Sequence, residues 1–237
     1  SECLVGSEMC IRDRYHAHAQ RLALMLQNQT EEEFADSRFQ VLSELTRLRQ
    51  LCCDPALVYE NYEGGSAKLD LCIELIQSAV ESGHKILLFS QFTSMIEILT
   101  ARLQEESISY FVLQGSTKKE QRAQMVEQFN RDDTSVFCIS LKAGGTGLNL
   151  TGADIVIHYD PWWNVAVENQ ATDRAHRIGQ KNVVTVYKLI AKGTIEEKII
   201  KLQQMKKELA EEILSGDEIK TASFQREELL ELLEERF

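Results

Sequence analysis

Two arginines in the C-terminal half of the chain have the spacing of a phosphate clamp. Arg174 and Arg177 stand three positions apart in the segment DRAHRIGQ, and Gln170 lies four positions before Arg174. On a helix expected over 165–177, residues three and four apart lie on one face. Two permanently charged, planar donors side by side suit a γ-phosphate and the charge of its transition state. An exposed, salt-bridged arginine pair is the alternative interpretation.

A glycine-rich segment, SLKAGGTGLNL over 140–150, is a second candidate for contact with phosphate. Its three glycines let the backbone approach a ligand closely, and Lys142 adds a positive charge. The segment is not a Walker A motif, because no Gly-Lys-Ser/Thr follows at the required spacing. It is not a Rossmann fingerprint either, because Leu150 stands where the third glycine would be. A tight turn is the alternative.

Two further polar segments follow apolar runs. SQFTS over 90–94 comes directly after KILLF, and QGSTKKEQR over 114–122 comes after SYFVL. The first offers polar side chains, and the second offers backbone N–H groups with Lys118, Lys119 and Arg122, so both suit an anion. Each could instead be the capped, solvated start of a helix.

Two adjacent tryptophans, Trp162 and Trp163, follow another apolar run. Neighbouring residues of an extended segment face opposite sides, so we expect one of the two rings to be exposed. An exposed tryptophan near basic residues can stack on nucleic-acid bases or wedge between them.

These segments need a scaffold that brings them together, and the apolar pattern predicts one. Strands are expected at 85–89, 109–113, 135–140, 154–158 and 183–189, and helices at 68–82, 93–105, 118–130 and 165–177. This alternation is typical of a parallel sheet in an α/β fold. Ligands of such sheets bind beyond the carboxyl ends of the strands, which is where the candidate segments begin.

Helical segments flank the α/β unit. The apolar spacing over 15–51 predicts two helices, an amphipathic helix is expected from Gly193 to about Leu214, and a short acidic one over 225–235. The first fourteen residues show no clear periodicity and are expected to be a non-native or disordered leader. The expected organisation is a leader (1–14), a helical linker or protrusion (15–66), the α/β unit (67–193) and a C-terminal amphipathic helix followed by an acidic one (194–237).

The composition excludes several classes of protein. The 237 residues are 43% hydrophobic and 27% charged, which is typical of a folded globular protein. No apolar run approaches the ~18 residues that span a bilayer, so we expect no membrane partner. The six cysteines include no C-x-x-C, so neither a metal site nor a disulfide framework is expected, and a reducing cytoplasm fits best.

The net charge of −11 argues against nucleic acid only until its distribution is considered. Residues 208–237 carry ten acidic and three basic side chains, whereas 170–192 carry five basic and one acidic. The net charge therefore sums the charges of an acidic tail and a basic segment. We expect any affinity of this chain for nucleic acid to be weak by itself, local to the candidate segments described above, and dependent on a partner.

In this order, the segments resemble the C-terminal helicase lobe of the Swi/Snf-related branch of superfamily-two DNA-dependent ATPases, of the bacterial type. SLKAGGTGLNL resembles motif V, DRAHRIGQ with Gln170 resembles motif VI, and LLFSQFTSM resembles motif IV. The similarity extends over about 42–214, because LRQLCCDPALV and KGTIEEKIIKLQQMKK are similar to the family's flanking segments. It implies a RecA-like parallel sheet flanked by helices, with an N-terminal helical extension and C-terminal brace helices.

The resemblance also implies roles for individual residues. Arg174 and Arg177 would reach a nucleotide held by the other lobe, with Gln170 in support, and the backbone would approach that nucleotide at Gly145 and Gly147. The residues expected to meet DNA are Gln91, Gly115, Ser116, Ser140, Lys142, Ala143 and Trp163. Val165 stands where relatives usually have proline, which affects how Trp163 is presented.

The implied cofactor is ATP, with Mg²⁺ held by an N-terminal RecA-like lobe, because this chain has neither a Walker A lysine nor an Asp-Glu-Ala-His-type box. The implied activity is translocation on double-stranded DNA, with a protein complex as the object remodelled, in the cytoplasm at the nucleoid. This lobe alone is expected to be inactive. Two alternatives are a non-catalytic module that binds a protein partner through its acidic helices, and a nucleotide-binding transferase that uses GGTG.

Overall fold

The computed structural model describes residues 2–5, 9–141, 148–175, 180, 182–212 and 226–233. In these residues six strands form one sheet in the order β1-β6-β5-β2-β4-β3, and every neighbouring pair is parallel. The strands are β1 (Glu2–Val5), β2 (Ile86–Ser90), β3 (Tyr110–Leu113), β4 (Val136–Ser140), β5 (Ile155–His158) and β6 (Thr185–Ala191).

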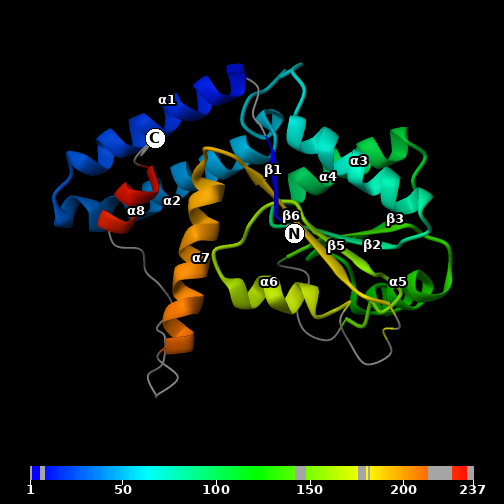
Figure 1. The fold of residues 1–237 in the computed structure, drawn as a ribbon. Helices are drawn as coiled ribbons and strands as arrows, with labels where there is room; N and C mark the ends of the chain where they lie inside the picture. Colours follow the sequence, from blue (N-terminus) through cyan, green and yellow to red (C-terminus); the bar gives the residue numbers. More distant parts are fainter. Residues whose placement is uncertain are drawn as a thin grey trace.

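Helices cover both faces of this sheet (Figure 1). They are α1 (Met9–Gln27), α2 (Glu31–Cys53), α3 (Ala67–Glu81), α4 (Thr93–Glu105), α5 (Lys119–Arg131), α6 (Val165–Thr172), α7 (Ile195–Glu212) and α8 (Arg226–Leu233), with a 3-10 turn at Pro55–Leu57. Helices α3 and α4 lie on one face, and α5 and α6 lie on the other, so the α/β unit has three layers. None of the described helices is both long and apolar enough to cross a bilayer.

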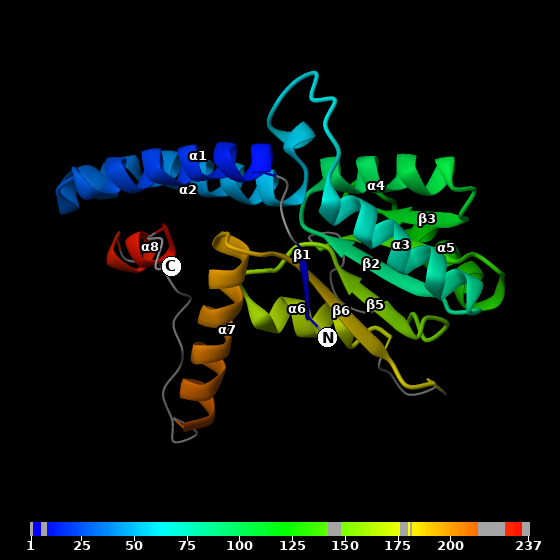
Figure 2. The ribbon, with the colours of Figure 1, turned by 45° about the horizontal axis from the view of Figure 1, so that its top comes forward.

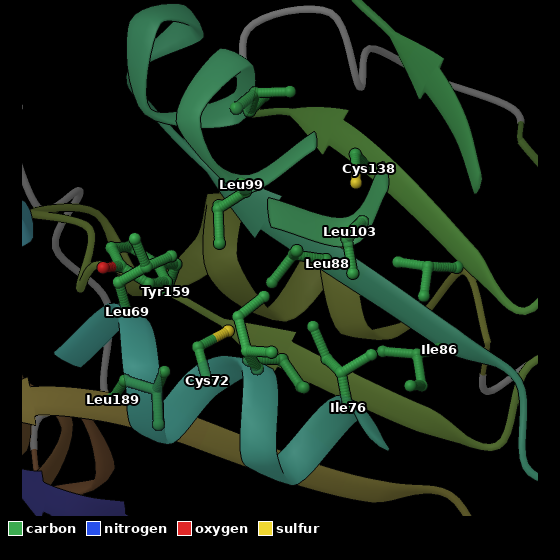
Figure 3. Packing of buried hydrophobic residues seen from close by; sticks show 14 of the residues in the cluster. Leu69, Cys72, Ile76, Ile86, Leu88, Leu99, Leu103, Cys138, Tyr159 and Leu189 are labelled. Atoms are coloured by element: carbon green, nitrogen blue, oxygen red, sulfur yellow. The ribbon is translucent and has the colours of Figure 1, made fainter. Parts of the chain in front are cut away.

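The alternation of side chains along the strands sends two apolar sets to the two faces. Leu88 and Cys138 pack against α3 and α4, in the cluster that Figure 3 shows with Cys72 and Leu99. The intervening residues, such as Phe89 and Phe137, pack on the other face against α5 and α6. Strands β2, β4 and β5 are buried on both faces, as expected for the middle of a parallel sheet.

A second unit is made of helices alone. Helices α1 and α2 run side by side, and α8 and the start of α7 pack against them (Figure 2). Thr30 and Glu33 form a capping box that starts α2: Thr30 N–H donates to Glu33 Oε2 at 2.8 Å, and Glu33 N–H donates to Thr30 Oγ1 at 3.3 Å. The apolar faces of these helices form a core separate from those of the sheet.

The predicted parallel sheet with flanking helices is confirmed. The five predicted strands and the helices α3, α4 and α5 begin and end within about two residues of the expected positions. The prediction for the leader is wrong in part, because Glu2–Val5 forms β1 and α1 begins at Met9. Strand β1 pairs with Lys188–Ala191, and in doing so it satisfies backbone groups along the edge of β6.

The predicted helix over 165–177 is also too long, because α6 ends at Thr172. Beyond that residue the backbone tightens: Arg174 N–H donates to Ala171 O and Ala175 N–H donates to Thr172 O, both three residues back. The carbonyl of Arg174 accepts a hydrogen bond from Leu150 N–H at 3.1 Å. The Arg174 carbonyl, which a longer helix would use as an acceptor, is therefore bonded instead to the loop after β4.

Candidate functional site at the carboxyl edge of the sheet

The carboxyl ends of β2, β4 and β5 meet at one place, as the sequence predicts. Ser90 and Ser140 are register partners at the last positions of β2 and β4. Leu141 N–H donates to Ser90 O at 3.0 Å, and Tyr159 N–H donates to Phe89 O at 2.9 Å. The segments that resemble motifs IV and V and the one that carries the tryptophans thus leave the sheet side by side.

Asp160 ties two of these segments together. Its carboxylate is 1% exposed, accepts a hydrogen bond from Ser90 Oγ at 2.6 Å, and accepts another from Gln91 N–H at 3.3 Å. Burial raises the pKa of Asp160, and the nearby Arg49 charge opposes that rise. Sequence reasoning missed Asp160, although a carboxylate directly after a buried strand was a signal.

The two tryptophans face opposite sides, but the predicted exposure of one of them is wrong. Trp162 packs with the apolar cluster under α5 and α6, and Trp163 packs with the core of the helical unit. Both side chains are half-buried. The Trp163 ring is covered in part because the guanidinium of Arg49 lies 5.2 Å from its centroid, within reach of a cation–π interaction.

Arg174 is folded into the lobe rather than presented on a helix. Its side chain is 6% exposed, and its guanidinium lies 5.7 Å from the ring centroid of Phe89. Gln170, by contrast, is exposed on α6. The prediction that one helical face carries Arg174 and Arg177 is wrong, because α6 ends before Arg174. Arg177 itself lies outside the described residues.

Four further predicted contacts also lie outside the described residues: Lys142, Ala143, Gly145 and Gly147. Ser140 is described, and it is 2% exposed, so this arrangement does not favour direct contact between its side chain and DNA. Gln91 is half-buried, and its Nε2 has no hydrogen-bond partner in the described part of the chain. This nitrogen is buried, so a ligand at the edge could reach it only if the side chain turned outward.

The turn after β3 presents Gly115 and Ser116, which are both exposed. A Cβ built on Gly115 would meet no atom within 4 Å, so the backbone there is open to a ligand. Arg122, predicted to offer its charge to an anion, instead holds the turn: Nε donates to Thr117 O at 2.8 Å and Nη2 to Gly115 O at 3.1 Å. Its role is structural.

His158, the last residue of β5, is buried beneath the site. Its Nε2 lies 3.0 Å from Thr172 Oγ1, and its ring stacks on Phe89 with centroids 5.5 Å apart. Burial lowers the pKa of His158 to about 4, although the carboxylate of Glu168 favours the charged form. The imidazole is therefore neutral near pH 7.

A buried ion pair connects the site to the helix that follows the sheet. Lys68 Nζ lies 2.8 and 2.7 Å from the two carboxylate oxygens of Glu196, whose Oε2 also accepts from Ala191 N–H. Burial alone would lower the pKa of Lys68, but the Glu196 carboxylate raises it above its usual value. Sequence reasoning missed this pair. The signal was a lysine four positions before Cys72, in the apolar stripe of α3.

The described residues hold no group of three or more His, Cys, Asp or Glu side chains that could bind a metal ion. The expectation that another lobe holds Mg²⁺ stays a prediction. The chemistry that these residues offer in this arrangement is contact with anions through the exposed backbone at Gly115.

Comparisons with known proteins show which family this arrangement is similar to. Residues 67–179 match the family described as "Helicase conserved C-terminal domain". The chain is 45% identical over 202 residues to an "Uncharacterized ATP-dependent helicase" of Mycoplasma pneumoniae. That alignment covers 84% of this chain and 19% of the relative, so the chain spans about a fifth of that protein.

Two solved structures have the same fold. One is the "SWI2/SNF2 ATPase C-terminal domain" of Sulfolobus solfataricus, which is 31% identical with a TM-score of 0.73, over 92% of this chain and 90% of that one. The other is the "SWI2/SNF2 ATPase core in complex with dsDNA" of the same organism. It is 32% identical with a TM-score of 0.76, over 91% of this chain and 45% of that one.

Proposed function

Because the chain belongs to the SWI2/SNF2 family of ATPases, as a helicase C-terminal domain, we propose that it is the C-terminal lobe of an ATP-driven translocase on double-stranded DNA. The observation that carries the proposal is the convergence of the loops after β2, β4 and β5 at one edge, where Asp160 ties two of them together. The similarity to an ATPase core solved with double-stranded DNA supports the choice of substrate.

In this proposal ATP lies between this lobe and an N-terminal lobe that holds Mg²⁺. Arg174 and Arg177 compensate the charge of the transferring phosphoryl group, Gln170 supports them, and the backbone at Gly145 and Gly147 faces the nucleotide. Closure of the two lobes on ATP brings these groups into place, and hydrolysis releases them.

The DNA side of the proposal uses a separate set of contacts. The open backbone at Gly115, the hydroxyl of Ser116 and the amide of Gln91 meet phosphates, together with Lys142 and Ala143, while Trp163 meets the minor groove. Phosphate contacts carry no sequence information, so binding is independent of sequence and falls steeply with salt. A protein complex on the DNA is then displaced or remodelled by translocation.

The test of the arginine role is steady-state ATP hydrolysis by the protein with both lobes. We expect Arg177→Ala or Arg174→Ala to lower kcat by about a thousandfold, with DNA affinity retained, because the charge that compensates the transferring phosphoryl group is lost. Arg131→Ala is the control, since Arg131 is 78% exposed and pairs with Glu127 at the surface. A loss of less than tenfold in both arginine variants would contradict the role.

The 237-residue chain alone should not hydrolyse ATP, because half of the nucleotide site belongs to the other lobe. It should still bind duplex DNA weakly at low salt, and this binding should vanish as salt is raised. Hydrolysis by the purified chain that Arg177→Ala abolishes would overturn the division into two lobes. Failure to bind duplex DNA at any salt concentration would favour a non-catalytic module that binds a protein.

A further inference from the structure

The short segment Pro161, Trp162 and Trp163 is held by side chains from outside the sheet. Arg49 of α2 donates from Nη2 to Pro161 O at 2.6 Å. Gln203 of α7 donates from Nε2 to Trp162 O. These two donors fix consecutive carbonyls of the segment from two helices that lie far apart in the sequence.

A third contact fixes the same segment from within the α/β unit. Glu168 of α6 accepts a hydrogen bond from Trp162 N–H at 3.2 Å, and Lys188 of β6 pairs with Glu168 at 2.5 Å. The backbone of Trp162 is therefore bound at its N–H and at its carbonyl. Bonds of this kind at successive peptide groups fix the backbone of the segment, and so the direction in which its side chains leave the chain.

Arg49 acts on the tryptophan ring as well as on the backbone. It is 5% exposed, and its guanidinium lies 5.2 Å from the ring centroid of Trp163 and 5.8 Å from that of Phe92. Phe92 follows Gln91 in the loop after β2. One guanidinium thus contacts two of the loops that carry proposed DNA contacts, and a planar, stacking donor is what this geometry requires.

Burying a guanidinium is costly unless other groups compensate for the lost water. Here the compensation comes from the carbonyl of Pro161, the rings of Trp163 and Phe92, and the attraction of the Asp160 carboxylate. The Arg49 charge in turn opposes the rise in the pKa of Asp160 that burial causes. Every one of these partners lies at the carboxyl edge of the sheet. The free-energy cost of burying the Arg49 guanidinium is therefore offset when these groups at the edge keep this arrangement.

We infer that Arg49 and Gln203 are positioning residues for Trp163, so that α2 and α7 set how this ring is presented at the edge of the sheet. The functional half of this inference rests on the proposed contact between Trp163 and DNA. The geometric half does not, because it concerns the tryptophan in the free protein.

The geometric half can be read from fluorescence. The chain has two tryptophans, and Trp162→Phe leaves Trp163 as the only one while keeping the backbone bonds at position 162. In that background we expect Arg49→Met and Gln203→Met to shift the Trp163 emission to longer wavelength. We also expect iodide quenching of Trp163 to rise by about twofold, because a cation–π contact and a backbone anchor are lost. Arg49→Lys, which keeps the charge but not the planar donor, should fall between wild type and Arg49→Met.

The controls are the neighbouring residues of the same type on the same helices. Arg47→Met removes an exposed arginine of α2, and Gln204→Met removes an exposed glutamine of α7. Neither should change the emission of Trp163. If Arg49→Met does not unfold cooperatively, the positioning role is tested by Gln203→Met and Arg49→Lys instead. Unchanged emission and quenching in those two variants would overturn the inference.

The functional half is tested by duplex DNA binding of the same chain at low salt. Trp163→Ala should weaken binding severalfold, and adding Arg49→Met to Trp163→Ala should weaken it no further, because Arg49 acts through the ring. An additional loss in the double variant would show that Arg49 acts on DNA by another route and would overturn the positioning role. If Trp163→Ala has no effect while the fluorescence changes occur, the proposed DNA contact fails and the positioning stands.

Discussion

The middle of the sheet and its carboxyl edge beside α2 and α7 are both buried, yet they are held by different forces. Strands β2, β4 and β5 are packed on both faces by aliphatic and aromatic side chains. The edge is held by buried charges, among them Arg49, Lys68, Asp160 and Glu196. Apolar burial stabilises without direction, whereas hydrogen-bonded charges fix orientation at little net gain. The middle of the sheet thus supplies stability, and the edge supplies geometry.

The largest effect should come from breaking the buried ion pair. Lys68→Met is expected to lower the free energy of unfolding by about 3–5 kcal/mol, because it leaves the Glu196 carboxylate buried without a counter-charge. Urea unfolding at pH 7 measures this loss. Lys201→Met is the control: Lys201 is 71% exposed and 3.9 Å from Glu197, so its loss should cost less than about 0.5 kcal/mol.

The double variant Lys68→Met with Glu196→Gln separates the charge from the packing. The glutamine keeps an acceptor for Ala191 N–H but carries no charge. We expect it to regain most of the stability that Lys68→Met loses. A double variant as unstable as the single one would mean that the edge is stabilised by packing, like the middle of the sheet.

His158 lies between the two regions and should make stability depend on pH. In the unfolded chain its pKa is near 6.5, whereas burial lowers it to about 4 in the folded state. The unfolded state therefore binds the proton first, and stability is lost as pH falls from about 6.5 to about 4, by up to about 3 kcal/mol. Urea unfolding across this range, with and without His158→Gln, isolates the contribution. An unchanged slope in the variant would show that other groups cause it.

The smallest effect should come from the middle of the sheet. Ile86→Val removes one methyl group from a fully buried position of β2 and should cost about 0.5–1.5 kcal/mol. Because apolar packing has no direction, the emission of Trp163 in the Trp162→Phe background should stay the same. A shift in that emission would show that the two regions are coupled more closely than their contacts indicate.

The sequence predicted the parts of this molecule that depend on local pattern. The strands at the middle of the sheet were predictable because continuous apolar runs with flanking turns have few other solutions. The convergence of the motif loops followed from the parallel topology. The end of α6 was not predicted, because the apolar pattern does not show where the backbone tightens, nor that the Arg174 carbonyl bonds Leu150 N–H in a tertiary contact.

The buried charges escaped prediction for a similar reason. A lysine or arginine in an apolar stripe normally extends its charged end to water. Only the fold shows that Glu196 lies within hydrogen-bonding distance of Lys68, and Pro161 O within hydrogen-bonding distance of Arg49. The partial burial of the Trp163 ring escaped prediction for the same reason, because the ring packs against a helical unit that no local sequence pattern places beside it. The roles of Arg177 and the glycine-rich loop stay predictions, because those residues lie outside the described ranges.

The contact between α8 and α1 has a consequence for folding during synthesis. Arg226 Nε donates to Leu26 O at 2.8 Å and its Nη2 donates to Gln27 O, so a residue 200 positions later in the sequence than Leu26 caps the last turn of α1. Leu229 and Leu232 complete the same apolar core. At the ~5–20 residues per second of translation, roughly 10–40 s separate the emergence of these partners. The sheet can close in that interval, before α8 is available to pack against α1.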